Sequence, residues 1–260
     1  MHSATIQLHA LPGIPAVREG EDLARLIEDG LRQASLQLAP GDVLVLAQKI
    51  VSKSEGRLID LASVKPGLAA LQLAVEVQKD ARVVELILSE SRRVVRKRPG
   101  LLIVEHRLGY IMANAGLDQS NTGPNDGHEY ALLLPRNPDA SALRLREILE
   151  SRHGPGLGVI INDSFGRPWR RGTVGVALGA SGIPALLDLR ETPDLFGRVL
   201  KTTVVGHADE IAAAASLLMG QADEGRPVVL LRGIRPECAT RYAESPAAQL
   251  VRGPEEDLFR

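Results

Sequence analysis

Residues 157–172 read LGVIINDSFGRPWRRG. The apolar first part has the length of a strand, so it predicts a buried strand. Asn162, Asp163 and Ser164 come at the end of this run, and the chain then turns through three arginines and the only tryptophan. A carboxylate and a hydroxyl beside arginines predict a site where a metal ion meets an anionic substrate, as phosphoryl or acyl-phosphate transfer requires. The structural alternative is a capped turn followed by surface arginines.

Apolar runs and helical spacing of apolar residues continue on both sides of this stretch. We expect helices at residues 20–38, 68–91 with a break near 79–80, 139–152 and 208–219. We expect further strands at residues 43–47, 94–95, 101–104, 110–112, 174–178, 185–189, 201–205 and 227–231. Helices and strands do not alternate strictly, which predicts an α+β or mixed α/β fold of the non-Rossmann type. The predicted domain spans residues 1–235, and residues 236–260, where the apolar periodicity fades, are the predicted C-terminal tail.

The overall composition excludes several classes of protein. The chain has 260 residues with 31 Lys and Arg against 32 Asp and Glu, so it lacks the basic excess of a nucleic-acid binder. Hydrophobic residues make up 44%, enough for a substantial core in one domain or in two interwoven lobes. The single cysteine, Cys238, excludes an internal disulfide and a cysteine-rich zinc site, which predicts a cytoplasmic protein. Neither a signal peptide nor a membrane-spanning run is expected.

Two further segments contain the glycines and cations that are typical of phosphate binding. LPGIP at residues 11–15 forms a tight turn whose backbone amides would cradle a phosphate or ribose, and an ordinary turn is the alternative. QKIVSKSEGR at residues 48–57 follows a buried strand, and Lys49 and Lys53 lie four residues apart. On a helix the two lysines project from one face and would hold a polyphosphate. The alternative is a solvated basic face.

A fourth segment, NAGLDQSN at residues 114–121, combines small residues with oxygen donors. Asp118 supplies an anionic oxygen and Asn121 an amide oxygen, which are ligand types that Mg²⁺ and Mn²⁺ accept. An Asx turn is the structural alternative. The sequence contains no P-loop, no Gly-x-Gly-x-x-Gly fingerprint and no Gly-x-Ser-x-Gly elbow, which excludes the common nucleotide-binding and serine-hydrolase classes.

Taken in this order, the four segments resemble the coenzyme F420-0:L-glutamate ligase family, also called F420 γ-glutamyl ligase. DLFGR at residues 194–198 and LMGQA at residues 218–222 add to the resemblance, which extends over residues 5–233. The resemblance implies a non-Rossmann mixed α/β fold of two interwoven lobes with mixed sheets, and a homodimer with composite active sites. It also implies GTP as the co-substrate, Mn²⁺ or Mg²⁺ as the metal, and coenzyme F420-0 and L-glutamate as the molecules that are joined.

Residue by residue, the resemblance carries GTP binding to Leu11, Pro12, Gly13, Ile14, Gln48, Lys49, Lys53, Asn121, Met219, Gly220 and Gln221. It carries metal binding to Asp118, Asp163, Ser164 and Gln221, and we assign catalysis to Asp118, Asp163, Arg167 and Arg170. Two positions depart from the archaeal pattern of the family. Gln221 stands where a glutamate contributes to a second metal, and Gln48 replaces a serine. A neutral amide binds a divalent ion more weakly than a carboxylate does.

These observations predict a GTP-dependent ligase that amidates coenzyme F420-0 with L-glutamate through an acyl phosphate and then adds further γ-linked glutamates. Only a short segment follows residue 235, so we expect the stand-alone ligase without a fused flavin-reductase-like domain. The alternative, from another class, is a metal-dependent nucleotide-binding regulatory protein without ligase activity. Glutamate-dependent release of GDP distinguishes the two, because a binding protein releases none.

Overall fold

A five-stranded mixed sheet lies at the centre of the main lobe in a computed structural model, which describes residues 4–120, 122–123, 126–234 and 242–257. The strands follow the order β1 (Gln7–Ala10), β12 (Val228–Arg232), β2 (Val43–Ala47), β8 (Gly158–Arg167) and β9 (Arg170–Ser181). β2 and β8 are parallel, and the other neighbouring pairs are antiparallel. The mixed sheet confirms the non-Rossmann fold that the sequence predicts.

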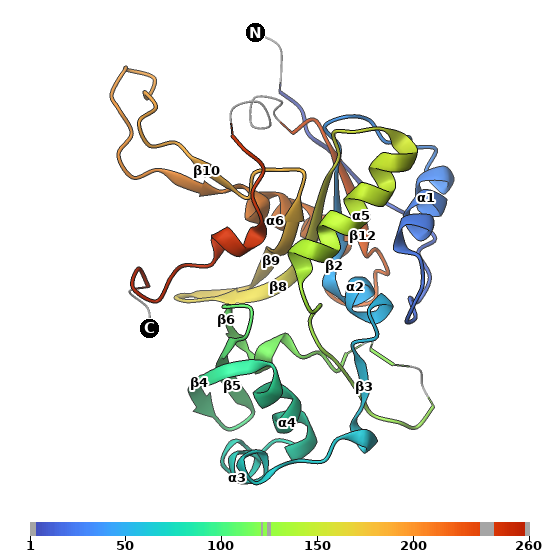
Figure 1. The fold of residues 1–260 in the computed structure, drawn as a ribbon, viewed down its shortest axis with the longest axis vertical. Helices are drawn as coiled ribbons and strands as arrows, with labels where there is room; N and C mark the ends of the chain where they lie inside the picture. The colour runs from blue at the N-terminus through green and yellow to red at the C-terminus, as the bar shows by residue number, and fades with distance from the viewer. Residues whose placement is uncertain (1–3, 121, 124–125, 235–241, 258–260) are drawn as a thin grey trace.

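Helices cover both faces of this sheet (Figure 1). Two pack on one face and one packs on the other, namely α1 (Leu23–Gln33) and α5 (Pro138–His153), and opposite them α6 (His207–Met219). In β2, Leu44 and Leu46 belong to the core under α1 and α5, whereas Val43 and Val45 belong to the core under α6. Successive side chains of a strand point to opposite faces, so a strand that is covered on both sides is apolar at every position.

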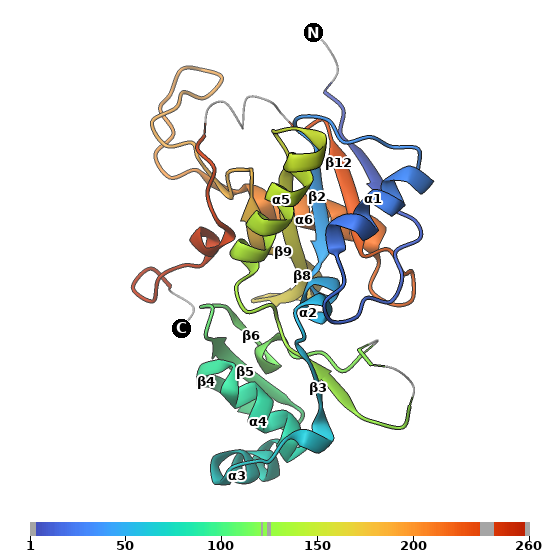
Figure 2. The same ribbon diagram turned by 45° about the vertical axis from the view of Figure 1, so that its right-hand side comes forward.

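A smaller lobe is inserted between β2 and β8 in the sequence (Figure 2). It consists of α3 (Leu68–Val77), α4 (Ala81–Ser89) and an antiparallel sheet of β4 (Ser91–Arg98), β5 (Leu101–His106) and β6 (Ile111–Ala113). Gln78 adopts a left-handed conformation with φ +52°, and the Asp80 side chain caps the first turn of α4. These two residues produce the helix break that the sequence predicts near residues 79–80.

The connections between the lobes run side by side. The chain enters the smaller lobe through β3 (Leu58–Asp60) and leaves it through β7 (Tyr130–Leu132), and these strands pair antiparallel with each other. The short 3₁₀ helix η1 (Leu61–Ser63) follows β3, and a second one, η2 (Asn114–Gly116), follows β6. The two lobes are therefore interwoven, as the resemblance implies.

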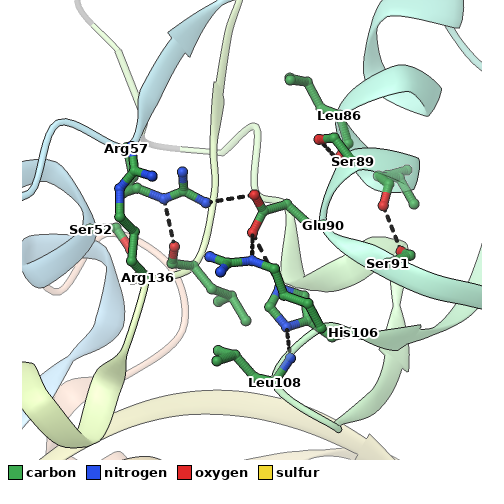
Figure 3. Close-up of polar contacts among 12 residues, drawn as sticks. Ser52, Arg57, Leu86, Ser89, Glu90, Ser91, His106, Leu108 and Arg136 are labelled. Carbon is green, nitrogen blue, oxygen red and sulfur yellow. Dashed lines mark hydrogen bonds and ion pairs between the residues drawn. The ribbon is translucent and has the colours of Figure 1, made fainter.

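A buried cluster of charged side chains joins the lobes (Figure 3). Arg57 of the main lobe reaches Glu90 at the end of α4, with 2.9 Å between Nη2 and Oε1, and its Nε donates to the Leu134 carbonyl oxygen at 2.9 Å. Glu90 also contacts Arg107 at 2.8 Å and His106 at 3.5 Å. Burial acts to raise the pKa of Glu90, but hydrogen bonds from His106, Arg107 and Arg57 outweigh it and lower this pKa far below the ordinary value.

Several predicted strands have other limits in the structure, and β8 and β11 differ as follows. The strand expected to end before Asn162 continues as β8 to Arg167, because its polar half pairs with β9 in a hairpin whose tip is Pro168 and Trp169. The prediction that the strand ends before Asp163 is therefore wrong, whereas the chain does turn among the arginines and Trp169 as expected. The strand expected at residues 201–205 is the shorter β11 (Val204–Gly206), which pairs with β10 (Leu186–Asp188).

The final described segment, residues 242–257, lies against the main lobe. Its 3₁₀ helix η3 (Ala247–Leu250) packs on the core under α6, and Ala247 is fully buried. The Asp139 carboxylate accepts hydrogen bonds from the backbone N–H groups of Ala247 and Ala248 at 2.8 and 3.1 Å. Within the described ranges, every helix is too short or too polar to cross a lipid bilayer.

Candidate active site

The residues singled out in the sequence meet at one edge of the central sheet. Because β2 and β8 are parallel, their carboxyl ends lie together, which is where open α/β sheets place ligands. A cavity of about 460 Å³ opens at this edge. Most of the predicted site residues line it, namely Ile14, Gln48, Lys49, Lys53, Asp118, Asp163, Ser164, Met219, Gly220 and Gln221. Segments far apart in the sequence thus form one site.

Two lysines reach the cavity from the helix α2 (Gln48–Ser54), which follows β2 without a connecting loop. Lys49 and Lys53 lie one helical turn apart, as their spacing predicts. Gln48 is buried at the start of the helix, and its side-chain oxygen accepts a hydrogen bond from the Ser52 hydroxyl at 2.8 Å. This internal hydrogen bond fixes the first turn, on which Lys49 lies.

An ion pair joins two segments that line the cavity. Lys49 Nζ lies 2.6 Å from Asp118 Oδ2, and the other carboxylate oxygen of Asp118 accepts hydrogen bonds from the Ser120 N–H and hydroxyl, both at 2.7 Å. Burial acts to raise the pKa of Asp118, but the hydrogen bonds from Lys49 and Ser120 outweigh it and lower this pKa. Asp118 is therefore held as a carboxylate at neutral pH.

Asp163 faces the same cavity from β8. Burial raises the pKa of Asp163 to about 7, the hydrogen bond from the Ser164 N–H opposes this, and the neighbouring Asp118 carboxylate adds to it. A half-buried carboxylate next to a second carboxylate needs a cation to stay ionised at low energetic cost. The site thus contains one carboxylate that Lys49 neutralises and a second that lacks a comparably close cationic partner among the described residues.

The donors around Asp163 fit a hard divalent cation. Asp118 and Asp163 supply carboxylate oxygens, and Ser164 and Gln221 line the same cavity with a hydroxyl and an amide oxygen. No group of three or more His, Cys, Asp or Glu side chains within the described ranges is arranged to hold a metal by itself. Mg²⁺ in nucleotide enzymes typically uses one or two protein carboxylates and completes its shell with phosphate oxygens and water. Two carboxylates with neutral oxygens match that pattern.

Lys53 contributes a cation whose charge is poorly solvated. Burial lowers the pKa of Lys53, and the positive charge of Lys49 lowers it further, against an opposing effect of Asp118. An anion bound between the two lysines would reverse this shift, because it stabilises the charged form of both amines. The pair of lysines is thus suited to phosphate.

The loop after α6 closes the cavity with charges that the sequence analysis missed. Glu224 and Arg226 line it, between the end of α6 and the start of β12. Gly220 has φ +73°, and a Cβ atom there would overlap the Glu224 carboxyl group, so this loop conformation requires glycine. Gly220 and Gly225 flank the acidic residues of this loop in the sequence, and this spacing could have predicted a tight loop that faces a ligand.

The other predicted site residues do not line this cavity, or they are not among the residues that the structure describes. Among described residues the cavity begins at Ile14, and Leu11 is buried in the core, where its N–H donates to the Val228 carbonyl oxygen at 2.9 Å. Pro12 and Gly13 do not line it. Arg167 and Arg170 pair with each other near the tip of the β8–β9 hairpin, away from the cavity. Asn121 lies outside the described residues. The roles assigned to these residues stay predictions.

Fold and cavity together define an enzyme that combines fixed cations with paired carboxylates at the edge of a mixed, non-Rossmann sheet. Comparison with known proteins gives its family. The profile of the F420-0:Gamma-glutamyl ligase family matches residues 13–233, and the chain belongs to this family of ligases. The resemblance recognised in the sequence is thereby confirmed.

Relatives of known name match over almost their whole length. The protein named coenzyme F420:L-glutamate ligase in Methanopyrus kandleri is 46% identical over 256 residues, which cover 98% of each chain. The protein of the same name in Methanothermobacter thermautotrophicus is 44% identical, with 98% of this chain and 99% of the relative covered. The one from Archaeoglobus fulgidus is 39% identical, with 98% and 96% covered.

Proposed function

We propose that this protein joins L-glutamate to coenzyme F420-0 in a reaction driven by GTP. The observation that carries the proposal is the convergence of Lys49, Lys53, Asp118 and Asp163 in one cavity at the ends of β2 and β8. The names of the full-length relatives support the pair of substrates. They favour a ligase over a nucleotide-binding regulatory protein, the alternative class.

The proposed reaction solves the problem that a carboxylate does not condense with an amine at neutral pH. The substrate carboxylate attacks the γ-phosphorus of GTP, GDP leaves, and an acyl phosphate forms. The glutamate amine then attacks the acyl carbon, the tetrahedral intermediate expels phosphate, and the amine loses a proton to give the amide. Positioning and charge neutralisation supply most of the catalysis in phosphoryl transfer.

Four charged residues of the cavity have a part in this scheme, namely Lys49, Lys53, Asp118 and Asp163. Lys49 and Lys53 bind nucleotide phosphates, and the release of Asp118 from Lys49 frees a carboxylate oxygen as the nucleotide enters. Asp118, Asp163, Ser164 and Gln221 would hold Mn²⁺ or Mg²⁺, which when bound neutralises charge on the phosphates. Gln221 supplies a neutral oxygen, so a second ion held there binds more weakly than one held by the carboxylates.

We further propose a homodimer with composite sites, as the sequence resemblance implies. The β8–β9 hairpin and the loop between β10 and β11 carry exposed large apolar side chains, with Trp169 88%, Leu195 99% and Phe196 87% exposed. Large exposed apolar side chains on projecting segments are typical of protein–protein contacts. Arg167 and Arg170 lie on this hairpin outside the cavity of their own subunit, so in this scheme they serve the site of the partner subunit.

The direct test incubates the protein with F420-0, GTP, Mn²⁺ and L-glutamate and analyses the products by mass spectrometry. We expect a product heavier by one glutamate residue, GDP release that depends on glutamate, and, with time, products carrying further glutamates. GDP release without an amide product would contradict the ligase proposal. A single addition that never extends would contradict only the oligoglutamate part.

A further inference from the structure

A second cavity, of about 200 Å³, lies beside the candidate active site and has no part in the scheme above. It lies between the turn leading into β6, the β8–β9 hairpin and the C-terminal segment. Its walls are mostly apolar and include Tyr110, Ile111, Phe165, Val176, Leu250 and Val251. Ligand pockets combine such apolar walls with a few polar groups, which here are Asp209, Arg252 and Asp257.

The strand register places this cavity next to Asp163. Val176 of β9 is the direct partner of Asp163 of β8, and Phe165 follows Asp163 by two residues. Directly paired residues of antiparallel strands share a face, about 4.5–5.5 Å apart at Cα, and alternate residues of one strand share it about 7 Å apart. The side chains of Asp163, Phe165 and Val176 therefore point to the same side of the hairpin. The two cavities therefore lie on the same side of the hairpin, with Asp163 lining the first and Phe165 and Val176 lining the second.

One wall of the cavity is a fixed aromatic pair. The rings of Tyr110 and Phe165 meet edge to face, with 5.8 Å between their centroids and an interplanar angle of 88°. The Tyr110 hydroxyl donates to the Leu178 carbonyl oxygen at 2.7 Å, which holds the Tyr110 ring between the smaller lobe and β9. Such a preformed aromatic and aliphatic wall favours a flat aromatic ligand over a charged or flexible one.

We propose that this second cavity binds the deazaflavin ring of coenzyme F420-0 while the carboxylate of the same molecule lies at Asp163. The inference rests on the proposed function. It adds a binding site for the ring of the substrate, which is the part remote from the reacting carboxylate. The ring is flat and aromatic with a polar pyrimidine edge, and a ribityl phosphodiester chain separates it from the carboxylate that is amidated. The apolar walls suit its faces, and the Arg252 side chain at the cavity supplies a donor for its carbonyl oxygens.

The test measures binding of F420-0 through the fluorescence anisotropy of its own ring, in full-length protein. Val251→Trp fills the cavity, and Phe165→Ala removes one of its aromatic walls. Val75→Trp is the matched control, because Val75 is 80% exposed on α3 in the smaller lobe, away from the second cavity. We expect at least tenfold weaker F420-0 binding in the first two variants and an unchanged Kd in the control. GTP affinity, measured by calorimetry, should stay within twofold in all three.

A truncated ligand makes the test specific for the ring. The deazaflavin riboside, which lacks the phosphate and the carboxylate, should compete with F420-0 on the wild-type protein and lose this ability in Val251→Trp. Should Val251→Trp fail to bind GTP, Ile111→Trp fills the cavity from its partly exposed rim instead. F420-0 binding of wild-type strength in the cavity variants would overturn the ring site and leave the ligase proposal standing. Absence of F420-0 binding by the wild-type protein, with GTP present or not, would overturn both.

Discussion

Asp163 lies within a paired strand, where the sheet fixes its half-buried carboxylate near Asp118. Asp163→Asn removes this poorly solvated charge and keeps the shape of the side chain. Without metal at pH 8, we expect the melting temperature to rise by a few degrees, since each kcal/mol corresponds to about 2–4 °C for a chain of this size. We also expect the stabilisation of the wild-type protein by Mn²⁺ to disappear.

Differential scanning fluorimetry with and without Mn²⁺ measures both effects. Asp188→Asn is the control, because Asp188 is an exposed carboxylate that pairs with Arg190 far from the cavity. An Mn²⁺-induced shift of wild-type size in Asp163→Asn would show that the metal is held elsewhere.

Lys53 is expected to hold a nucleotide phosphate. Lys53→Ala should weaken GTP binding about ten- to a hundredfold, since a hydrogen bond to a charged group is worth about 1.5–3 kcal/mol. Isothermal titration calorimetry gives the affinity, and Lys65→Ala, an exposed lysine of the smaller lobe, serves as the control. GTP affinity equal to that of the wild-type protein would show that Lys53 holds no nucleotide phosphate.

At the level of residues, the sequence predicts what local spacing determines. Lys49 and Lys53 are a helical turn apart in any helix, so their shared face follows from their numbering alone. The contact between Arg57 and Glu90 depends on how the two lobes fold together, so no local sequence pattern predicts it. The position of Arg167 outside the cavity likewise depends on the length of the hairpin, which its partner strand decides.

Among the structural elements, the turn before Asp118 is under steric constraint. Ala115 has φ +54° and Gly116 has φ +67°, and a Cβ atom on Gly116 would lie 2.6 Å from Met112 Cε and 2.9 Å from Leu134 Cδ1. Gly116→Ala should therefore displace the following segment, which carries Asp118 into the cavity. We expect a stability loss of about 1–3 kcal/mol together with weaker Mn²⁺ and GTP binding.

In Gly116→Ala both backbone strain and a steric clash lower stability, and Gly100→Ala serves as the control that separates the two. Gly100 has φ +80°, but nothing lies within 4 Å of a Cβ atom placed there, so this variant introduces backbone strain without a clash. Urea denaturation and GTP titration of both variants give the comparison. Equal losses of GTP affinity in the two variants would contradict a specific displacement of Asp118.

The elements that the sequence predicts best are those whose burial pattern is local. The apolar run of β2 and the break between α3 and α4 lie where expected. A strand packed on both faces is apolar at every position, and the break contains a capping aspartate, so both can be read from the local sequence. The strands β3 and β7 are only three residues long, too short to show a periodic pattern of apolar residues, so the sequence does not predict them. The polar half of β8 is not predicted either, because pairing with β9, and not its own composition, keeps it extended.

For the molecule as a whole, Glu90 is expected to control how firmly the lobes hold together. Glu90→Gln leaves Arg57 buried without its counter-ion, and breaking a buried ion pair costs about 3–5 kcal/mol. Because the pKa of Glu90 is lowered in the folded protein, its stabilising contribution is complete above the ordinary glutamate pKa and is lost as the pH falls below it.

Denaturation curves recorded from neutral to acid pH test both statements. The wild-type protein should lose stability more steeply in acid than Glu90→Gln, and the two should converge at low pH. Glu76→Gln, which breaks the exposed pair with Lys97, should change stability by less than about 1 kcal/mol. Parallel pH profiles for the wild-type protein and Glu90→Gln would show that Glu90 does not carry this acid sensitivity.

The proposed dimer predicts that activity depends on protein concentration. Composite sites need the partner subunit, so specific activity should fall on dilution through the range in which light scattering detects monomers. Phe196→Ser, at an exposed apolar position on the loop between β10 and β11, should shift this range to higher concentrations. Full specific activity in a sample of monomeric mass would contradict the composite site.

The insertion of the smaller lobe also bears on the order of events in folding. The strands β2 and β8 form the parallel pair at the active-site edge, yet residues 48–157 separate them along the chain. Closing so long a loop of flexible chain slows folding, because its entropy is lost before the pair is gained. The smaller lobe has its own core, and its entry and exit strands lie side by side, so once folded it shortens the loop that remains to be closed. The rate at which the edge that carries the candidate active site assembles therefore depends on a lobe that contributes no strand to its sheet.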